Sequence, residues 1–432
     1  KNQAPHHSRS KPSSMAMFRP TCTVLYSPAY FQESIIMLPL TVWGLALGQA
    51  LLITGNILLI SVNALIGQRL TPQPELATLP VAVQFLGLMA ATLPAAQIMR
   101  LMGRKFGFSV GNIIGLCGGL LACLAIVRAD FILFCISTTL LGVAIGVGQQ
   151  YRFAATEACA PADRPRAISL VMAGGVLAAI LGPTLAVWSD KLWPQPEFLG
   201  AFAALVTLYA INLLLIAALP LPRPTMAEQM GPVRSYSQLL QQPKLITAIV
   251  AGAIGYGVMI LVMTATPIAM HQHHHDFRST ASVIQWHVLG MFLPSFATGR
   301  LIARWGEVAI IQIGCGLLFT CVALAQTGTD YWYFWMALVA LGVGWNFTFI
   351  GATSLLTTCY QPAEKARVQG SNDFLVFGFS AIGSLLAGHL QARLGWSLLN
   401  LTMLPAIAVA MLLVWRNGRG DNNDQAEVSA SS

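Results

Sequence analysis

Polar side chains that recur inside long apolar stretches are the residues of this sequence most able to do chemistry. Gln49, Asn56 and Asn63 lie seven residues apart in one such stretch, which places them near one stripe of a helix. Amides on a stripe either line a polar cavity or bond to a neighbouring helix, and both interpretations stay open. Candidates of the same kind, all in or beside apolar stretches, are Gln149, Arg152, Tyr256, Thr264, Gln285, His287, Trp345 and Asn346.

This larger set combines aromatic rings with a few amides, a composition that suits the binding of a planar or amphipathic organic solute. The same rings are equally suited to packing between helices. Arg152 lies near the end of its apolar stretch. It is a candidate to face a cavity, to extend towards the membrane interface, or to pair with Glu157.

A cluster of imidazoles is the second candidate for chemistry. His271, His273, His274 and His275 precede Asp276 in a short polar segment. Imidazole nitrogens bind zinc, nickel or copper, so a metal ion or a metal chelate is one candidate cargo. The alternative is a solvated polar loop without a metal, and the sequence predicts no resident metal and no cofactor.

The composition determines the surroundings of these side chains. Of the 432 residues, 56% are hydrophobic and only 9% are charged, whereas soluble domains carry about 25% charged residues. The surface must therefore face lipid. The sequence contains neither the phosphate-binding loop of ATP-driven pumps nor the short motifs of hydrolases and kinases, so we expect neither a pump nor an enzyme.

A helix that crosses a membrane needs about 20 mostly apolar residues. The sequence contains twelve such runs and therefore predicts an all-α integral membrane protein with twelve transmembrane helices. The predicted spans are 41–66, 77–98, 107–127, 131–151, 167–188, 199–219, 245–270, 282–303, 308–327, 332–358, 368–390 and 396–415.

The spans divide into two related halves. A proline-rich polar segment separates the sixth span from the seventh, and its part 235–242 is predicted to form a short surface helix. Residues 161–166 read Pro-Ala-Asp-Arg-Pro-Arg, and residues 362–367 read Pro-Ala-Glu-Lys-Ala-Arg at the corresponding place in the second half. The predicted organisation is a tail and lead-in at 1–40, a six-helix bundle at 41–219, a linker at 220–244, a second six-helix bundle at 245–415, and a tail at 416–432.

Basic residues predict the orientation. With both termini in the cytoplasm, 19 of the 24 Lys and Arg residues fall on the cytoplasmic side, as the positive-inside rule requires. The net charge of +8 therefore needs no nucleic acid to explain it. We expect a monomeric, multi-pass protein of the cell inner (plasma) membrane, whose partners are the lipid bilayer and a small-molecule substrate.

One short motif resembles a known family. Gly103, Arg104 and Lys105 follow the second span and resemble the signature that the major facilitator superfamily carries between its second and third helices. The sequence departs from that signature in having Ala96 for a glycine and Arg100 where an acid is expected. The resemblance implies a bacterial transporter with two pseudo-symmetric six-helix bundles.

The fifth span carries a weaker resemblance. Gly174, Gly175 and the pair Gly182–Pro183 resemble part of the superfamily's Gly-Pro motif, with Ala178 in place of another glycine. The full motif is typical of exchangers that export solutes, so this partial match favours efflux over uptake.

The resemblance also assigns roles. In the superfamily the first and seventh helices line the central pathway, which favours a cavity position for Gln49 and Asn56. The acid of the signature normally locks the inner gate against the eleventh helix, which here contains Asp373. We expect Arg100 to pair with Asp373 across the halves, and Gly103, Arg104, Lys105 and Glu157 to complete this gate and coupling region. The alternatives for Asp373 are a proton carrier and a structural cap.

The predicted function is secondary active transport of a small organic solute across the inner membrane by alternating access, by a permease coupled to an ion gradient, that of protons. Two alternatives remain. One is a metal-ion or metal-chelate transporter that uses the outer His loop, and the other is a membrane receptor that transports nothing.

Overall fold

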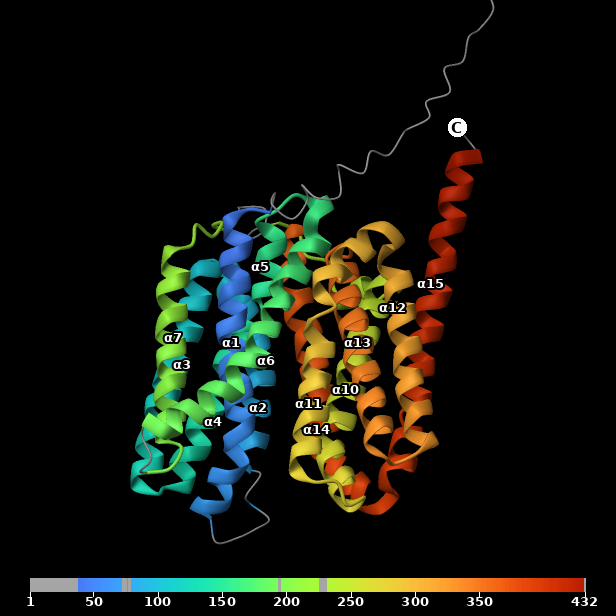
Figure 1. Cartoon of the computed structure of the whole chain (residues 1–432). Helices are drawn as coiled ribbons and strands as arrows, with labels where there is room; N and C mark the ends of the chain where they lie inside the picture. The colour runs from blue at the N-terminus through green and yellow to red at the C-terminus, as the bar shows by residue number, and fades with distance from the viewer. Residues whose placement is uncertain (1–37, 72–75, 77–78, 193–195, 225–230, 431–432) are drawn as a thin grey trace, which may run out of the picture. The chain divides into compact units, whose positions relative to one another are not determined.

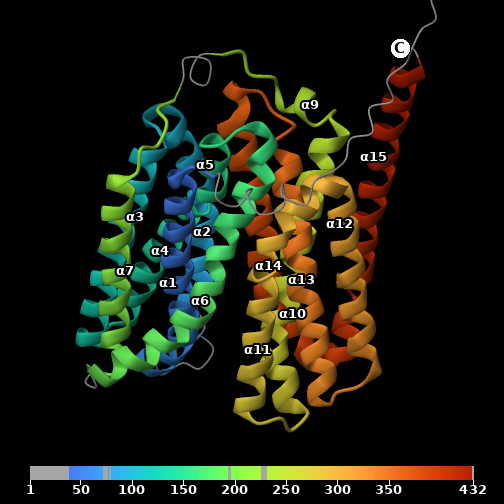
Figure 2. The ribbon, with the colours of Figure 1, turned by 45° about the horizontal axis from the view of Figure 1, so that its top comes forward.

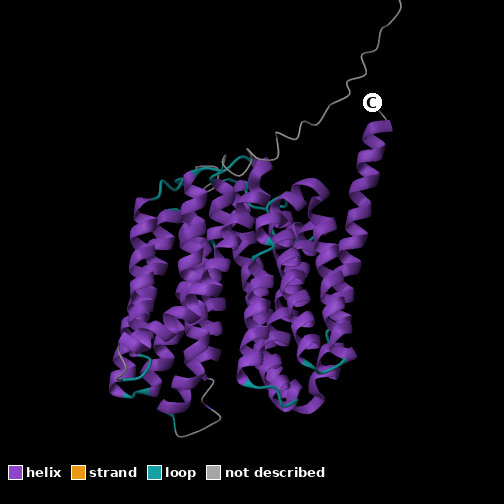
Figure 3. Ribbon diagram, in the orientation of Figure 1, coloured by secondary structure: helices purple, strands orange, loops and turns teal. Residues whose placement is uncertain are grey.

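The computed structural model describes residues 38–71, 76, 79–192, 196–224 and 231–430, and residues 38–432 form one structural unit. Every regular element in these residues is a helix (Figure 3). The predicted N-terminal tail lies outside the described residues except for its last three positions. The apolar runs form helices because only internally hydrogen-bonded backbone is stable in lipid.

The first half contributes seven helices that lie side by side, coloured blue to light green in Figure 1. The fourth predicted span is built from α4 and α5, which meet at Gln149 and Gln150. The helices are α1 (Leu40–Leu70), α2 (Leu79–Met102), α3 (Arg104–Arg128), α4 (Phe131–Gly148), α5 (Tyr151–Glu157), α6 (Arg164–Leu192) and α7 (Leu199–Ala218).

The second half lies beside the first and is coloured yellow to red in Figure 1. Its helices are α10 (Pro243–Gln272), α11 (Phe277–Phe292), α12 (Ser295–Thr327), α13 (Tyr331–Leu356), α14 (Lys365–Leu401) and α15 (Leu404–Ala430). The linker contains the predicted surface helix as α9 (Tyr236–Leu239), which is visible in Figure 2. Ser235 and Gln238 cap its first turn reciprocally.

Two glycines reconcile the observed helices with the twelve predicted spans. The described residues contain ten segments long and apolar enough to cross a membrane. Two of these segments, Arg278–Thr327 and Pro362–Asn417, are long enough for two spans each. They contain α12 and α14, which turn sharply at Gly306 (φ 80°) and Gly395 (φ 71°). Only glycine adopts such positive φ values without a steric cost. The twelve-helix architecture is therefore confirmed.

The two halves repeat each other in structure as well as in sequence. Gly103 between α2 and α3 has φ 91° and ψ 162°, and Gly306 has φ 80° and ψ 162° at the corresponding place. The two Pro-Ala-acid segments each form one 3₁₀ turn, at Pro161–Asp163 and Pro362–Glu364. Helix α2 packs on α4, as α11 packs on α13.

Helices α2 and α6 of the first half contact the second half. Helix α14 packs against α2, and α6 packs against α12; α6 also contacts α11 and α13. Small residues permit the close approach: a Cβ atom at Gly370 would lie 3.0 Å from that of Ala96, and one at Gly299 would lie 2.7 Å from the Cα atom of Arg166. These contacts lie towards the end of the bundles where the linker connects the halves, which we call the linker end.

Candidate functional site

A buried ion pair joins the halves. The guanidinium of Arg152 in α5 donates a hydrogen bond to the carboxylate of Asp373 in α14, and the side chains are 1% and 0% exposed. Asn372 also donates to Asp373, at 3.0 Å. Ionised groups inside a membrane are costly unless paired, so such a pair marks a functional position.

Gln150 connects this ion pair to a second charged layer nearer the linker end. Its Nε2 donates to Asp373 at 2.9 Å, and its Oε1 accepts a hydrogen bond from Arg104 at 2.9 Å. The side chain is completely buried. Both the nitrogen and the oxygen of the Gln150 amide therefore form hydrogen bonds, and these bonds connect the two layers.

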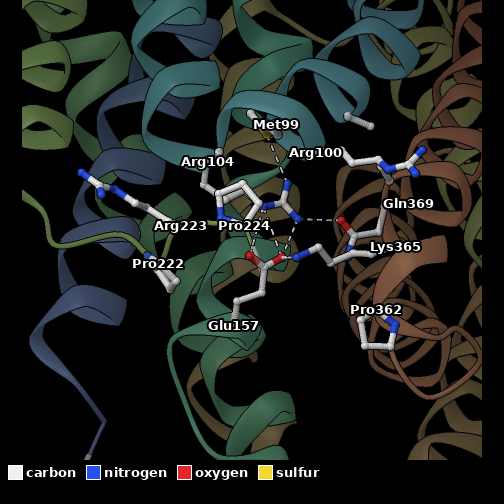
Figure 4. A pocket seen from close by; sticks show the side chains of 13 residues that line it. Met99, Arg100, Arg104, Glu157, Pro222, Arg223, Pro224, Pro362, Lys365 and Gln369 are labelled. Atoms are coloured by element: carbon white, nitrogen blue, oxygen red, sulfur yellow. Dashed lines mark hydrogen bonds and ion pairs between the residues drawn. The ribbon is translucent and has the colours of Figure 1, made fainter. Parts of the chain in front are cut away.

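The second layer is centred on Arg104, the first residue of α3. Arg104 donates to Glu157 of α5 at 2.6 Å and to Gln369 of α14 at 2.7 Å, and Lys365 of α14 lies 3.2 Å from the same carboxylate (Figure 4). Tyr360 accepts a hydrogen bond from Gln369 at 2.6 Å. Within these two layers, four contacts join the two bundles directly: Arg152 and Gln150 to Asp373, Arg104 to Gln369, and Lys365 to Glu157.

The structure corrects the predicted partner of Asp373. Within the described chain Asp373 binds Arg152, Gln150 and Asn372, and it does not bind Arg100. Arg100 instead lines a cavity at the linker end. It lies in the last turn of α2, close to the linker end, whereas Asp373 is two turns inside α14. A base from the first half does pair with Asp373, but α5 supplies it. Lys105 also lies outside the two layers and donates to the Leu219 carbonyl at 3.3 Å.

An aromatic cluster adjoins the Arg152–Asp373 pair. Tyr256 of α10 packs edge-on against Trp345 and Phe349 of α13 and Phe377 of α14, with ring centroids 5.2–5.4 Å apart. The guanidinium of Arg152 lies 4.8 Å from the centre of the Phe349 ring. The aromatic residues and the charged pair thus form one continuous group, which has the composition expected for binding a planar solute.

Eleven buried side-chain polar atoms of the described residues have no hydrogen-bond partner, and four of them belong to predicted cavity residues. Two of these four are the indole Nε1 of Trp345 and the Oε1 of Gln49, on side chains 1% and 2% exposed. An unsatisfied buried polar atom costs about 1–3 kcal/mol. A donor and an acceptor kept at this cost are candidates for contacts with a ligand.

Other predicted cavity amides are used in packing between helices. Gln84 of α2 donates to Asn56 at 3.1 Å and accepts from Asn63 at 2.7 Å. Asn346 donates to the Met291 carbonyl and to Ser295, both at 2.6 Å. For Asn56, Asn63 and Asn346 the observed contacts therefore favour the alternative of bonds between helices.

The remaining predicted residues are dispersed. Gln149 accepts a hydrogen bond from Arg152, and Thr264 is partly buried two turns along α10 from Tyr256. Gln285 is exposed on α11. His287 is buried against α13, where its Nδ1 lies 2.8 Å from the Leu338 carbonyl, so it does not join Gln285 in one surface.

The His loop closes the turn between α10 and α11. His275 Nε2 lies 2.7 Å from the Thr329 carbonyl, and the rings of His273 and His275 pack near Phe334. Asp276 caps α11, and hydrogen bonds from Ser279 hold the pKa of its carboxyl below the usual value. In the described part of the chain no three His, Cys, Asp or Glu side chains gather closely enough to hold a metal ion.

The linker is fastened to the second half by another ion pair. Arg234 binds the buried carboxylate of Glu364 at 2.6 Å, and these hydrogen bonds raise the pKa of Arg234. Arg367 donates to the backbone carbonyl of Arg234 at 2.8 Å, and its guanidinium lies over the Tyr236 ring. The linker therefore moves with the start of α14.

Sequence reasoning missed Gln150, Gln369 and Phe349. A signal for Gln150 was present, since it is adjacent to Gln149 and two positions before Arg152 in an otherwise apolar run. Gln369 and Phe349 gave no comparable signal, because only the packing of α14 and α13 against the first half brings them to the site.

An all-helical, twelve-span fold with charged layers across two repeated halves is the architecture of a membrane transporter. The chain belongs to the Major Facilitator Superfamily, which it matches over residues 45–381. It is therefore a multi-pass membrane transporter and not an enzyme, and the receptor alternative has no support.

Two relatives cover most of the chain. It is 41% identical over 372 residues to the riboflavin transporter RfnT of Brucella anthropi, a match that spans 85% of this chain and 93% of RfnT. It is 30% identical over 380 residues to the uncharacterized MFS-type transporter YdeG of Bacillus subtilis, spanning 83% and 88% of the two chains.

Solved structures share the fold. The human organic anion transporter MFSD10 (TETRAN) superimposes with a TM-score of 0.71 at 14% identity, covering 87% of this chain and 98% of that one. The E. coli fucose:proton symporter FucP gives a TM-score of 0.67 at 16% identity, with the same coverage.

Proposed function

We propose that this protein transports riboflavin, or a closely related planar heteroaromatic solute, across the cell inner membrane. The observation that supports riboflavin as the substrate is the 41% identity to RfnT, which extends over 93% of that transporter. The metal-ion and metal-chelate alternatives have no comparable support.

The aromatic cluster supports the same substrate class. Tyr256, Trp345 and Phe349 offer ring faces and edges to a flat solute, and such contacts contribute beyond the apolar area that they bury. The unpartnered N–H of Trp345 and the unpartnered carbonyl of Gln49 would serve the polar edge of a heteroaromatic ring. We infer that Arg152 senses the bound solute, because its guanidinium lies over Phe349.

We infer that the linker end faces the cytoplasm, because basic residues gather there. The described ones include Arg100, Arg104, Arg223, Arg234, Lys365 and Arg367. On this assignment the two charged layers form an inner gate that is closed in this conformation. Opening towards the cytoplasm requires that Arg152, Gln150 and Arg104 separate from α14.

We further propose that transport is coupled to protons through Asp373. A protonated Asp373 carries no charge and would hold Arg152 weakly, so protonation would release the deeper layer of the gate. The electrical and chemical proton gradients would then bias the direction of the gate cycle.

The test is riboflavin transport in a bacterial strain that cannot synthesise riboflavin and lacks its own transporter. Expression should restore growth at low riboflavin if the protein takes the vitamin up, or accelerate loss of preloaded riboflavin if it exports it. Tyr256→Ala should abolish either effect, whereas Trp286→Ala, which removes an exposed ring on α11, should not. Absence of both effects with the protein present in the membrane would refute riboflavin as the substrate.

A further inference from the structure

A second site lies at the linker end, apart from the aromatic cluster. A cavity of about 180 Å³ is enclosed by the α2–α3 turn, α5, the start of the linker and the first turn of α14. A cavity needs only about 10–15 Å³ of such volume to hold one water, so this one has room for a small solute. Its lining residues are drawn in Figure 4.

The cavity is strongly basic. Among the described residues that line it, four carry positive charge, namely Arg100, Arg104, Arg223 and Lys365, and Glu157 alone carries negative charge. The Glu157 carboxylate is already bound by Arg104 and Lys365. The described lining therefore has an excess of three positive charges.

Backbone dipoles add to this positive potential. Helix α3 begins at Arg104 and α14 begins at Lys365, so both present their N-termini to the cavity. The N-terminus of a helix carries about half a positive charge and favours anions. Gly103 makes the approach possible, because it adopts φ 91° and a Cβ atom there would lie 3.1 Å from Pro224 of the linker.

The four bases come from separate parts of the chain. Arg100 and Arg104 belong to the first half, Arg223 to the linker and Lys365 to the second half. In Figure 4 the side chains of Arg100 and Arg223 lie on opposite sides of the Arg104–Glu157 pair. Arginine side chains are long and flexible enough to turn towards an anion placed between them.

We propose that this cavity binds a phosphate group, supplied either by free inorganic phosphate or a phosphomonoester, or by the headgroup of an anionic lipid. The bound phosphate bridges the two halves and the linker. Since opening of the linker end must move Lys365 and Gln369 away from Arg104, the phosphate stabilises the closed linker end and slows the transport cycle. This regulation is separate from the choice of solute.

The first experiment measures phosphate binding by the purified full-length protein in detergent without added lipid. Isothermal titration with inorganic phosphate, at constant ionic strength, gives the dissociation constant. Arg223→Gln should raise the dissociation constant for phosphate about tenfold, since the variant removes one charge-assisted contact. Arg223 is exposed, so its loss should leave folding intact. Arg393→Gln, an exposed base on the far end of α14, is the matched control and should bind as the wild type does.

The second experiment separates the two sources of phosphate. The unfolding temperature is compared in nanodiscs of phosphatidylcholine alone and in nanodiscs that also contain phosphatidylglycerol. If phosphatidylglycerol raises the unfolding temperature, and Arg223→Gln reduces this effect whereas Arg393→Gln retains it, the site binds a lipid headgroup. Titration of inorganic phosphate with the same dependence on Arg223 assigns it to a soluble phosphate.

Either result supports the proposal, and neither requires riboflavin, so the site can fail or succeed independently of the substrate. The proposal is overturned if neither phosphate source binds, or if binding is equally affected by Arg223→Gln and Arg393→Gln. A binding curve that chloride or sulfate reproduces at equal concentration would likewise exclude a phosphate site.

Discussion

Arg152 and Asp373 lie 221 positions apart in the chain, yet their side chains form a fully buried ion pair between α5 and α14. Few contacts could link the two halves more directly. The pair is also the meeting point of the aromatic cluster, through Phe349, and of the Arg104 layer, through Gln150.

The buried pair should dominate the stability of the closed state. Asp373→Asn leaves Arg152 buried without its carboxylate, a change that typically costs about 3–5 kcal/mol. We expect a large fall in the unfolding temperature in detergent. Asp163→Asn breaks the half-exposed pair with Arg166 and is the control, because such surface pairs contribute about 0–1 kcal/mol.

Charge exchange identifies the partner. Arg152→Asp combined with Asp373→Arg should recover part of the lost stability, whereas Arg100→Asp combined with Asp373→Arg should not. Recovery by the Arg100 combination alone would reverse this assignment. A pure proton carrier would instead give an Asp373→Asn protein that keeps solute exchange, loses proton-driven accumulation and is rescued by neither combination.

Gln150 should couple the two charged layers. Gln150→Leu removes its hydrogen bonds to Arg104 and Asp373 and should lower the free energy of unfolding by about 1–3 kcal/mol. Gln97→Leu, at an exposed position of α2, should have little effect. Thermal unfolding of the two variants checks this, and equal stability of both would show that the bridge contributes nothing.

Trp345→Phe separates ligand binding from packing. The variant keeps an aromatic ring beside Tyr256 and Phe349 but lacks the unpartnered N–H. If that N–H binds riboflavin, affinity should fall about tenfold while the unfolding temperature of the ligand-free protein changes little. Quenching of flavin fluorescence measures the affinity. Trp335→Phe, whose ring packs on Trp286, is the control, and identical affinities in both variants would contradict the role of the indole N–H.

A cross-link should trap the closed linker end. A Cβ atom at Gly370 would lie 3.0 Å from that of Ala96, so Ala96→Cys with Gly370→Cys brings two thiols close enough to bond after a small adjustment. Oxidation should stop transport, and reduction should restore it. Each single cysteine variant should transport after the same treatment. Transport that continues through a fully cross-linked protein would mean that α2 and α14 need not separate.

The sequence by itself determined the membrane class, the twelve spans, the two repeated halves and the linker. These follow from local properties, because a run of about 20 apolar residues can only be satisfied as a helix in lipid. Even the sharp turns at Gly103 and Gly306 are local, since glycine adopts positive φ without a steric cost. The motif around Arg104 likewise pointed to the linker end of the protein.

The tertiary structure alone decided which charged groups meet. The sequence suggested that Asp373 needs a base from the first half, and Arg100 of α2 and Arg152 of α5 were both available. Only the packing of the helices shows that Arg152 lies beside Asp373. The same holds for the amides. The sequence cannot distinguish Asn346 and Asn56 from cavity residues, yet both form hydrogen bonds with neighbouring helices. Contacts between residues far apart in the chain depend on how helices pack, and no local pattern encodes that geometry.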